Sequence, residues 1–314
     1  MQTSAELIDV ADWTRDEDFA IFPVGSKPKR ALFCPAPSPY PFLIGGHRYM
    51  FKVSTGWRIF QHWSEVISFQ ISQITGGPAC APCFIAWDSK SNEVGVVVEF
   101  FYGHPQSGVP ARFLAGADLM RRAFEDFDSD TDGTHTWQNV QLICDAFQIQ
   151  DPVSFWARLL AFDALIGNTD RHSENWGVLA HLVPGTNDLN FTMAPAFDHG
   201  TSLAYQVRES DLARESTSAS ISKHVARGTH HLRFSGQQAI RGHFDLCQIV
   251  AETSASAKAA VAGMTTLSID GVKNVLNECC AFRLPEGVCS QERADYLIKL
   301  IEARRTALTA IIKV

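Results

Sequence analysis

Two short polar segments carry the residues of this chain that are best suited to chemistry. The first holds Asp170 and Asn175, and the second begins with Asp198 and continues His199-Gly200. Phosphoryl transfer needs a carboxylate that accepts the proton of the attacking hydroxyl, and oxygen ligands that hold Mg²⁺ against the phosphates. We assign the first role to Asp170 and the metal-binding role to Asn175 and Asp198. The alternative is that all three are ordinary helix-cap and turn residues.

The order of residues around Asp170 resembles that of known kinases. The spacing from Asp170 to Asn175 matches the protein-kinase loop H-R-D-x-x-x-x-N, although His172 here follows the aspartate. The order D-R-H-x-x-N with a later D-x-G resembles the HipA-like serine/threonine kinases, which are toxins of bacterial toxin–antitoxin pairs, and the related phosphoinositide kinases. The contexts LIGNTDRH and APAFD are more similar to HipA. This resemblance implies ATP and Mg²⁺ as cofactors, and an α+β, two-lobed protein-kinase-like fold with a β-rich N-lobe and a mostly helical C-lobe.

The N-terminal third offers the remaining nucleotide contacts. Kinases place a strand lysine on the phosphates and often pair it with a glutamate of the next helix, and Lys52 and Glu65 stand in that order. A surface lysine and a solvated glutamate are the alternative, since both residue types are usually exposed. The apolar run 96–101 is typical of the strand that enters the hinge between the lobes. By chain order, the backbone at Glu99 and Phe101 would contact the adenine.

The phosphate-covering loop has a weaker signature. The segment 25–30, Gly-Ser-Lys-Pro-Lys-Arg, precedes Lys52 and offers a glycine, a hydroxyl and three cations, while Gly45-Gly46 is a competing candidate. In the HipA-like family, phosphorylation of a loop serine inactivates the kinase, and Ser26 is the candidate counterpart. We expect His172 and Arg171 to stabilise the catalytic loop or the phosphate charge.

Hydrophobic periodicity and the residues that form turns and helix caps predict the elements that position these residues. We expect strands within 20–60, a helix over 63–74, and strands over 83–87 and 94–101. Asp151-Pro152 predicts the start of a helix that runs to Ile166 and is apolar nearly all round. Further helices are expected near 236–263, 269–281 and 290–313. The predicted N-lobe, which binds ATP, spans 1–105, and the C-lobe with the catalytic loop spans 106–314.

Composition limits the functional classes. Hydrophobic residues make up 46% and charged residues 19%, which is typical of a globular protein with a sizeable core. The net charge of −7 argues against a strongly basic nucleic-acid-binding surface. No apolar run reaches the roughly 18 residues of a membrane helix, and the N-terminus does not resemble a signal peptide. We therefore expect a cytoplasmic protein, whose eight cysteines are free thiols, with neither membrane association nor direct nucleic-acid binding.

Three functions remain open. The first is a HipA-like serine/threonine protein kinase acting as a bacterial toxin; by resemblance, its targets would include aminoacyl-tRNA synthetases and its partner would be a small helix-turn-helix antitoxin. The second is a lipid or small-molecule kinase of the phosphoinositide-kinase type, and the third is a pseudokinase that serves as a binding module. The absence of a basic membrane-facing cluster favours a protein substrate over a lipid. A short basic segment, 227–233, lies where a substrate would approach.

Overall fold

The computed structural model describes residues 2–17, 29–105, 111–128, 131, 133–235 and 240–313. Its β-rich part contains β1 (Ile8–Asp9), β2 (Thr14–Arg15), β3 (Lys29–Phe33), β4 (Arg48–Val53), α1 (Gln61–Thr75), β5 (Cys83–Asp88) and β6 (Glu93–Glu99). It is followed by β7 (Ala111–Ala115), α2 (Gly116–Ala123), α3 (Trp137–Ala146), α4 (Pro152–Ile166), β8 (Gly177–Leu182) and β9 (Leu189–Met193). The chain ends with α5 (Leu212–Glu215), α6 (Ser218–Ala226), β10 (Thr229–Phe234), β11 (Ile240–Gly242), α7 (His243–Ala251), α8 (Ala255–Met264), α9 (Ile269–Ala281) and α10 (Gln291–Ile312).

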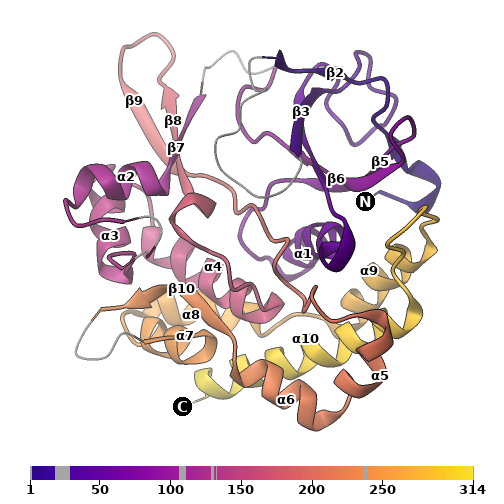
Figure 1. The fold of residues 1–314 in the computed structure, drawn as a ribbon. Helices are drawn as coiled ribbons and strands as arrows, with labels where there is room; N and C mark the ends of the chain where they lie inside the picture. Colours follow the sequence, from indigo (N-terminus) through magenta and orange to yellow (C-terminus); the bar gives the residue numbers. More distant parts are fainter. Residues whose placement is uncertain are drawn as a thin grey trace.

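The N-terminal strands form a six-stranded sheet in the order β1-β5-β6-β4-β3-β2. The β1–β5 pair is parallel, and the pairs from β5 to β2 are antiparallel. Because side chains alternate between the two faces of a strand, Tyr49, Phe51 and Val53 of β4 enter a small core on one face. Met50 and Lys52 therefore point to the other face, where α1 packs. Figure 1 shows α1 between this sheet and the helices of the second half of the chain.

Helix α4 is the centre of the second half. It begins and ends as the sequence predicts: Asp151 caps its first turn by accepting a hydrogen bond from the Ser154 N–H, and Gly167 ends it with φ of 71°. A left-handed backbone at this position favours glycine. The helix is buried nearly all round and packs against α7, α8 and α10. The segment that carries Asp170 follows directly, so its starting point is fixed by a helix that is largely buried.

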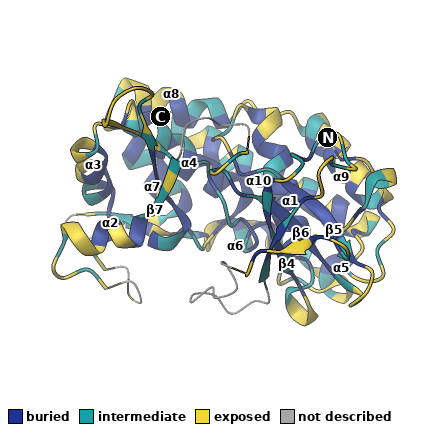
Figure 2. Ribbon diagram, turned by 90° about the horizontal axis from the view of Figure 1, so that it is seen from above, coloured by how far each residue is buried: buried dark blue, intermediate teal, exposed yellow. Residues whose placement is uncertain are grey.

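Burial divides the core in two. A large cluster joins α1 and one face of the sheet to α4 and the C-terminal helices, and a smaller one lies under the opposite face of the sheet. Figure 2 shows the dark-blue buried residues concentrated in the interior of both halves. None of the described helices is long and apolar enough to cross a membrane.

Several elements differ from the expectation. The second half is less exclusively helical, because β7, β8 and β9 form a three-stranded sheet and β10 and β11 form a hairpin. The predicted helix near 236–263 is two helices, α7 and α8, separated where Ser254 caps the start of α8. The other predicted helices are confirmed to within a few residues. The mixed α+β fold class is confirmed.

Candidate active site

Lys52 lies between two carboxylates that come from distant parts of the chain. Its Nζ is 2.8 Å from Glu65 Oε1 on α1 and 3.1 Å from Asp198 Oδ1. Burial alone would lower the pKa of Lys52, but Asp198 and Glu65 outweigh that effect and raise the pKa above its usual value. The lysine is therefore a fixed cation. The surface-lysine alternative is wrong, and Glu65, at 2% exposure, is not a solvated helix residue.

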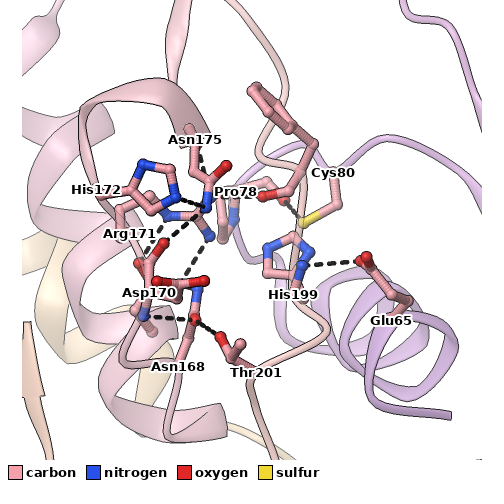
Figure 3. A network of polar contacts seen from close by, with 12 residues as sticks. Glu65, Pro78, Cys80, Asn168, Asp170, Arg171, His172, Asn175, His199 and Thr201 are labelled. Atoms are coloured by element: carbon pink, nitrogen blue, oxygen red, sulfur yellow. Dashed lines mark hydrogen bonds and ion pairs between the residues drawn. The ribbon is translucent and has the colours of Figure 1, made fainter. Parts of the chain in front are cut away.

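Glu65 also holds the segment that carries Asp198. Its Oε2 accepts a hydrogen bond of 2.8 Å from the backbone N–H of His199. Figure 3 shows Glu65 reaching from α1 to His199, with the catalytic loop on the other side of that residue. Asp198 itself has a φ of 58°, in the left-handed region that non-glycine residues seldom adopt. The carboxylate of Glu65 thus fixes both the lysine and the backbone next to this strained aspartate.

A buried ion pair organises the loop from Asp170 to Asn175. Arg171 and Asp163 of α4 are both fully buried, and the guanidinium binds the carboxylate through Nε and Nη2, each at 3.0 Å. Arg171 Nη1 also donates to the backbone carbonyls of Asn175 at 2.8 Å and Phe197 at 2.6 Å. One nitrogen therefore ties the end of the catalytic loop to the residue before Asp198. Of the two roles expected for Arg171, the structure shows loop stabilisation.

The other loop contacts set the orientation of Asp170 and Asn175. The Asp170 N–H donates to Asn168 Oδ1 at 3.1 Å, and Asn168 in turn donates to Asp163 Oδ1. Asn175 Nδ2 donates to the Asp170 carbonyl at 2.7 Å and lies 3.1 Å from His172 Nε2. The Asp170 side chain remains 42% exposed. Its backbone is held from both sides while its carboxylate can meet a substrate.

The same contacts allow the residues to be tested as magnesium ligands. The amide nitrogen of Asn175 is committed to the loop, so its oxygen is the atom that can serve as a ligand. An amide oxygen and the Asp198 carboxylate form the hard oxygen donor set that Mg²⁺ prefers. The residues present fit this ion, with His172 orienting Asn175.

The hinge residues lie at the opposite end of β4 from Lys52. Lys52 pairs with Val96 of β6, whereas Tyr49 pairs with Glu99, the last residue of β6. The Glu99 side chain contacts Tyr49 and His104, so only its backbone is available for a nucleotide base. Within the described part of the chain, the Phe101 N–H makes no hydrogen bond, and the Phe101 ring packs against Phe197 at 5.5 Å. This geometry is compatible with backbone recognition of adenine.

Ser26 lies outside the described residues, as does most of the segment 25–30. Lys29, the first residue of this segment that the structure describes, pairs with Lys52 across β3 and β4. Gly45-Gly46 instead precedes β4 at its Arg48 end, away from Lys52. The register therefore favours 25–30 over Gly45-Gly46 as the phosphate-covering candidate.

Two features near Asp170 were not identified as site elements from sequence. His231 of β10 places Nε2 3.7 Å from Asp170 Oδ1. A hollow of about 840 Å³ beside the loop is lined by Thr169, Thr201 and Tyr205 and by several cations. The basic segment 227–233 was the only signal for either, and it did not distinguish a strand from a loop.

The buried pair gives a test of loop architecture. Asp163→Asn would leave the Arg171 guanidinium buried without a carboxylate, so we expect the free energy of unfolding to fall by about 3–5 kcal/mol. Urea denaturation measures this change. Asp118→Asn is the matched control, because it removes an exposed pair with Arg121 on α2 and should change stability little. Equal losses in the two variants would contradict the organising role of Asp163.

Comparisons with known proteins identify the family of this chain and proteins with a similar fold. The HipA-like C-terminal domain family model matches residues 49–266, and no curated protein matches the sequence significantly. The chain superimposes on the proinflammatory kinase CtkA of Helicobacter pylori with a TM-score of 0.71 at 17% identity, covering 98% of both chains.

Two further solved structures are less similar. HipA of Shewanella oneidensis MR-1, in a complex with HipB and operator DNA, gives a TM-score of 0.45 at 13% identity and covers 96% of this chain and 65% of that one. The Golgi casein kinase gives 0.43 at 12% identity, covering 93% and 72%. These two superpositions are too loose to support an argument. The family match, however, spans most of the chain and includes Lys52, Asp170 and Asp198, so the chain belongs to the HipA-like C-terminal domain family and has a kinase-like fold.

Proposed function

We propose that this protein is an ATP- and Mg²⁺-dependent kinase, and that its acceptor is a serine or threonine hydroxyl of a protein. The observation that carries the proposal is the contact of Lys52 with both Glu65 and Asp198. A catalytic lysine held by a helix glutamate beside a metal-binding aspartate is the arrangement that phosphoryl transfer from ATP requires. A pseudokinase would not need all of these groups together with Asp170 and Asn175.

Each residue has one task in this mechanism. Lys52 binds and orients the phosphates of ATP, and Glu65 keeps the lysine in place. Asn175 and Asp198 would hold Mg²⁺, which would supply positive charge against the phosphate oxygens. Asp170 orients the acceptor hydroxyl and takes its proton as the oxygen attacks the terminal phosphorus, while the bond from that phosphorus to the bridging oxygen breaks and ADP leaves.

The base of the nucleotide would bind at the hinge. The Glu99 carbonyl and the Phe101 N–H are the acceptor and donor that the adenine edge requires, and both are backbone groups. The ring of Phe101 would pack beside the base. Ser26 and His172 would complete the phosphate end, Ser26 in the covering loop and His172 by holding Asn175.

The acceptor side is supported by the hollow beside Thr169. Its lining includes the cations Lys223 and Arg227 on and after α6, which suits an acceptor segment with acidic neighbours. A phosphoinositide headgroup is also anionic, so a lipid acceptor is the alternative. Incubation with labelled ATP and either a bacterial lysate or phosphoinositide vesicles separates the two, because label in lipid alone would overturn the protein-kinase assignment.

The toxin role and its partners remain predictions from the resemblance. An aminoacyl-tRNA synthetase would be one class of substrate, and a small helix-turn-helix antitoxin would be the partner. Overproduction in bacteria should arrest growth if the protein is a toxin. Co-expression with a small helix-turn-helix protein encoded beside it should then relieve the arrest.

Nucleotide binding gives the first functional prediction. The melting temperature should rise with ATP and Mg²⁺ together, because a ligand that binds only the folded state stabilises it. Asp198→Asn should abolish the Mg²⁺-dependent part of the rise in a thermal-shift assay. Asp188→Asn, an exposed position between β8 and β9, is the control and should behave as the unaltered protein. If millimolar Mg²⁺ and ATP leave the melting temperature unchanged, the kinase proposal fails.

Catalysis gives the second functional prediction. Asp170→Asn keeps the size of the side chain but removes the carboxylate that accepts the proton. We expect phosphate transfer to fall by about 10²–10⁴-fold, measured as label transferred from ATP, while ATP binding persists because Lys52, Asn175 and Asp198 are unchanged. Any growth arrest on overproduction should also be relieved. Transfer at the unaltered rate by this variant would show that Asp170 is not the base.

A further inference from the structure

Three side chains that are potential metal ligands meet behind the hinge, away from Lys52 and Asp170. His47 immediately precedes β4, Glu99 ends β6, and His104 lies in the segment that follows. One ligand atom from each lies within 4.8 Å of the other two, and this is the only such group found among the described residues. The three come from two chain segments joined by the β4–β6 pairing, so the fold itself brings them together.

The hydrogen bonding of His47 fixes which ring nitrogen can bind a metal. Its Nε2 is 2.6 Å from the carbonyl oxygen of Phe100. Because a carbonyl only accepts, Nε2 carries the proton and Nδ1 bears the lone pair. His47 is 1% exposed, and its Nδ1 has no hydrogen-bond partner in the described structure. A buried acceptor without a partner is destabilising, and a metal ion would satisfy it.

The surroundings provide the outer contacts that metal sites use. Metal-bound histidines commonly donate the other ring N–H to a backbone carbonyl, as His47 does to Phe100. The Tyr49 hydroxyl donates to Glu99 Oε2 at 3.3 Å, while Glu99 Oε1 is 3.2 Å from His104 Nε2. Tetrahedral zinc, with bonds of about 2.0–2.2 Å, separates its ligand atoms by about 3.3 Å, which is close to the spacing of Glu99 Oε1 and His104 Nε2. Because a carboxylate only accepts, His104 Nε2 donates the hydrogen of this contact in the metal-free protein, and a bound ion would displace that proton.

One adjustment is needed. The rings of His47 and His104 are stacked, with centroids 4.4 Å apart and planes inclined by 13°, so their lone pairs run side by side. His104 must turn its ring for both to meet one ion. Its side chain is 33% exposed, and it follows Gly103, which has a φ of 71° and no crowded neighbour. This side of the site can therefore close on a metal, whereas His47 is already fixed.

The cluster lies on the opposite face of the sheet from Lys52. Tyr49 and Glu99 are paired across β4 and β6, and Tyr49 belongs to the small core on the face away from α1. Lys52 points to the α1 face. An ion held by His47, Glu99 and His104 would therefore not occupy the place of the Mg²⁺ that ATP brings.

We propose that His47, Glu99 and His104 form a binding site for a divalent transition-metal ion, with Zn²⁺ the best match. Two imidazole nitrogens and one carboxylate are a ligand set known for zinc, with water in the fourth position. Mg²⁺ and Ca²⁺ prefer oxygen ligands alone. The metal would brace the Phe100 backbone, which lies between the two proposed adenine contacts. The site does not depend on the kinase proposal.

The test is a titration of the full-length, nucleotide-free protein with Co²⁺, followed by its visible absorption, and with Zn²⁺ by calorimetry. We expect one ion per chain, four-coordinate Co²⁺ absorption, and displacement of Co²⁺ by Zn²⁺ but not by millimolar Mg²⁺. His104→Ala, at a partly exposed position, should weaken binding at least tenfold and remove the absorption. Glu99→Gln should also weaken it.

Two controls exclude other histidine sites. His181→Ala removes a partly exposed histidine bonded to Thr192 on the β8–β9 hairpin, and His231→Ala removes the histidine beside Asp170. Both should bind Co²⁺ as the unaltered protein does. Loss of binding in His231→Ala with retention in His104→Ala would overturn the proposal by assigning the metal to the catalytic loop. Absence of stoichiometric Co²⁺ and Zn²⁺ binding to the unaltered protein would overturn it as well.

Discussion

The ion pair between Asp163 and Arg171 is the contact on which the geometry of the active site depends. Both groups are fully buried, and a buried pair is expensive to dehydrate, so it adds little net stability by itself. Its effect is positional. By holding the guanidinium at the end of α4, Asp163 aims Arg171 Nη1 at two backbone carbonyls, Asn175 and Phe197. The residues proposed to bind metal therefore approach each other through their backbones, whether or not an ion is present.

Glu65 performs the corresponding task from the other half of the protein. Its two oxygens bind different partners, Lys52 through Oε1 and the His199 N–H through Oε2. The α1 helix thus holds both the lysine and the segment that carries Asp198. A shift of α1 would move both contacts together. In the described arrangement, Lys52 and Asp198 form an ion pair. On nucleotide binding, the phosphates would contact Lys52 and Mg²⁺ would contact Asp198, so each charge would gain a new partner.

The elements and contacts that form the site could be predicted from the sequence to different extents. The start of helix α4 was predicted because Asp151-Pro152 acts locally on the backbone, and its predicted end at Ile166 is also confirmed. The face of Lys52 follows from the strand period. The role of Asp163 could not be predicted, since a single aspartate in an apolar helix has no pattern and its partner is defined only by tertiary packing. Strands β7 to β9 were missed for a similar reason, because short strands derive stability from their neighbours.

The site residues also differ in whether a local sequence signal or only a tertiary contact identifies them. Asp170, Asn175 and Asp198 could be proposed from the sequence because their order and flanking residues resemble those of known kinases. His231 was not, because it reaches Asp170 from β10, a strand distant in sequence.

The two ends of β4 would allow one strand to contribute to both of the proposed ion sites. Tyr49 and Lys52 are three residues apart, about 10 Å along the strand, which is about the reach of a nucleotide from its base to its phosphates. An odd separation also places the two side chains on opposite faces. The pairing of Tyr49 with Glu99 then sends that carboxylate away from the phosphate end, where it meets histidines instead of a lysine. The α1 face near Lys52 offers oxygen ligands, which Mg²⁺ prefers, and the opposite face near Glu99 offers imidazole nitrogens, which suit Zn²⁺. Because successive side chains of a strand point to opposite faces, the two proposed ion sites lie on different sides of the sheet.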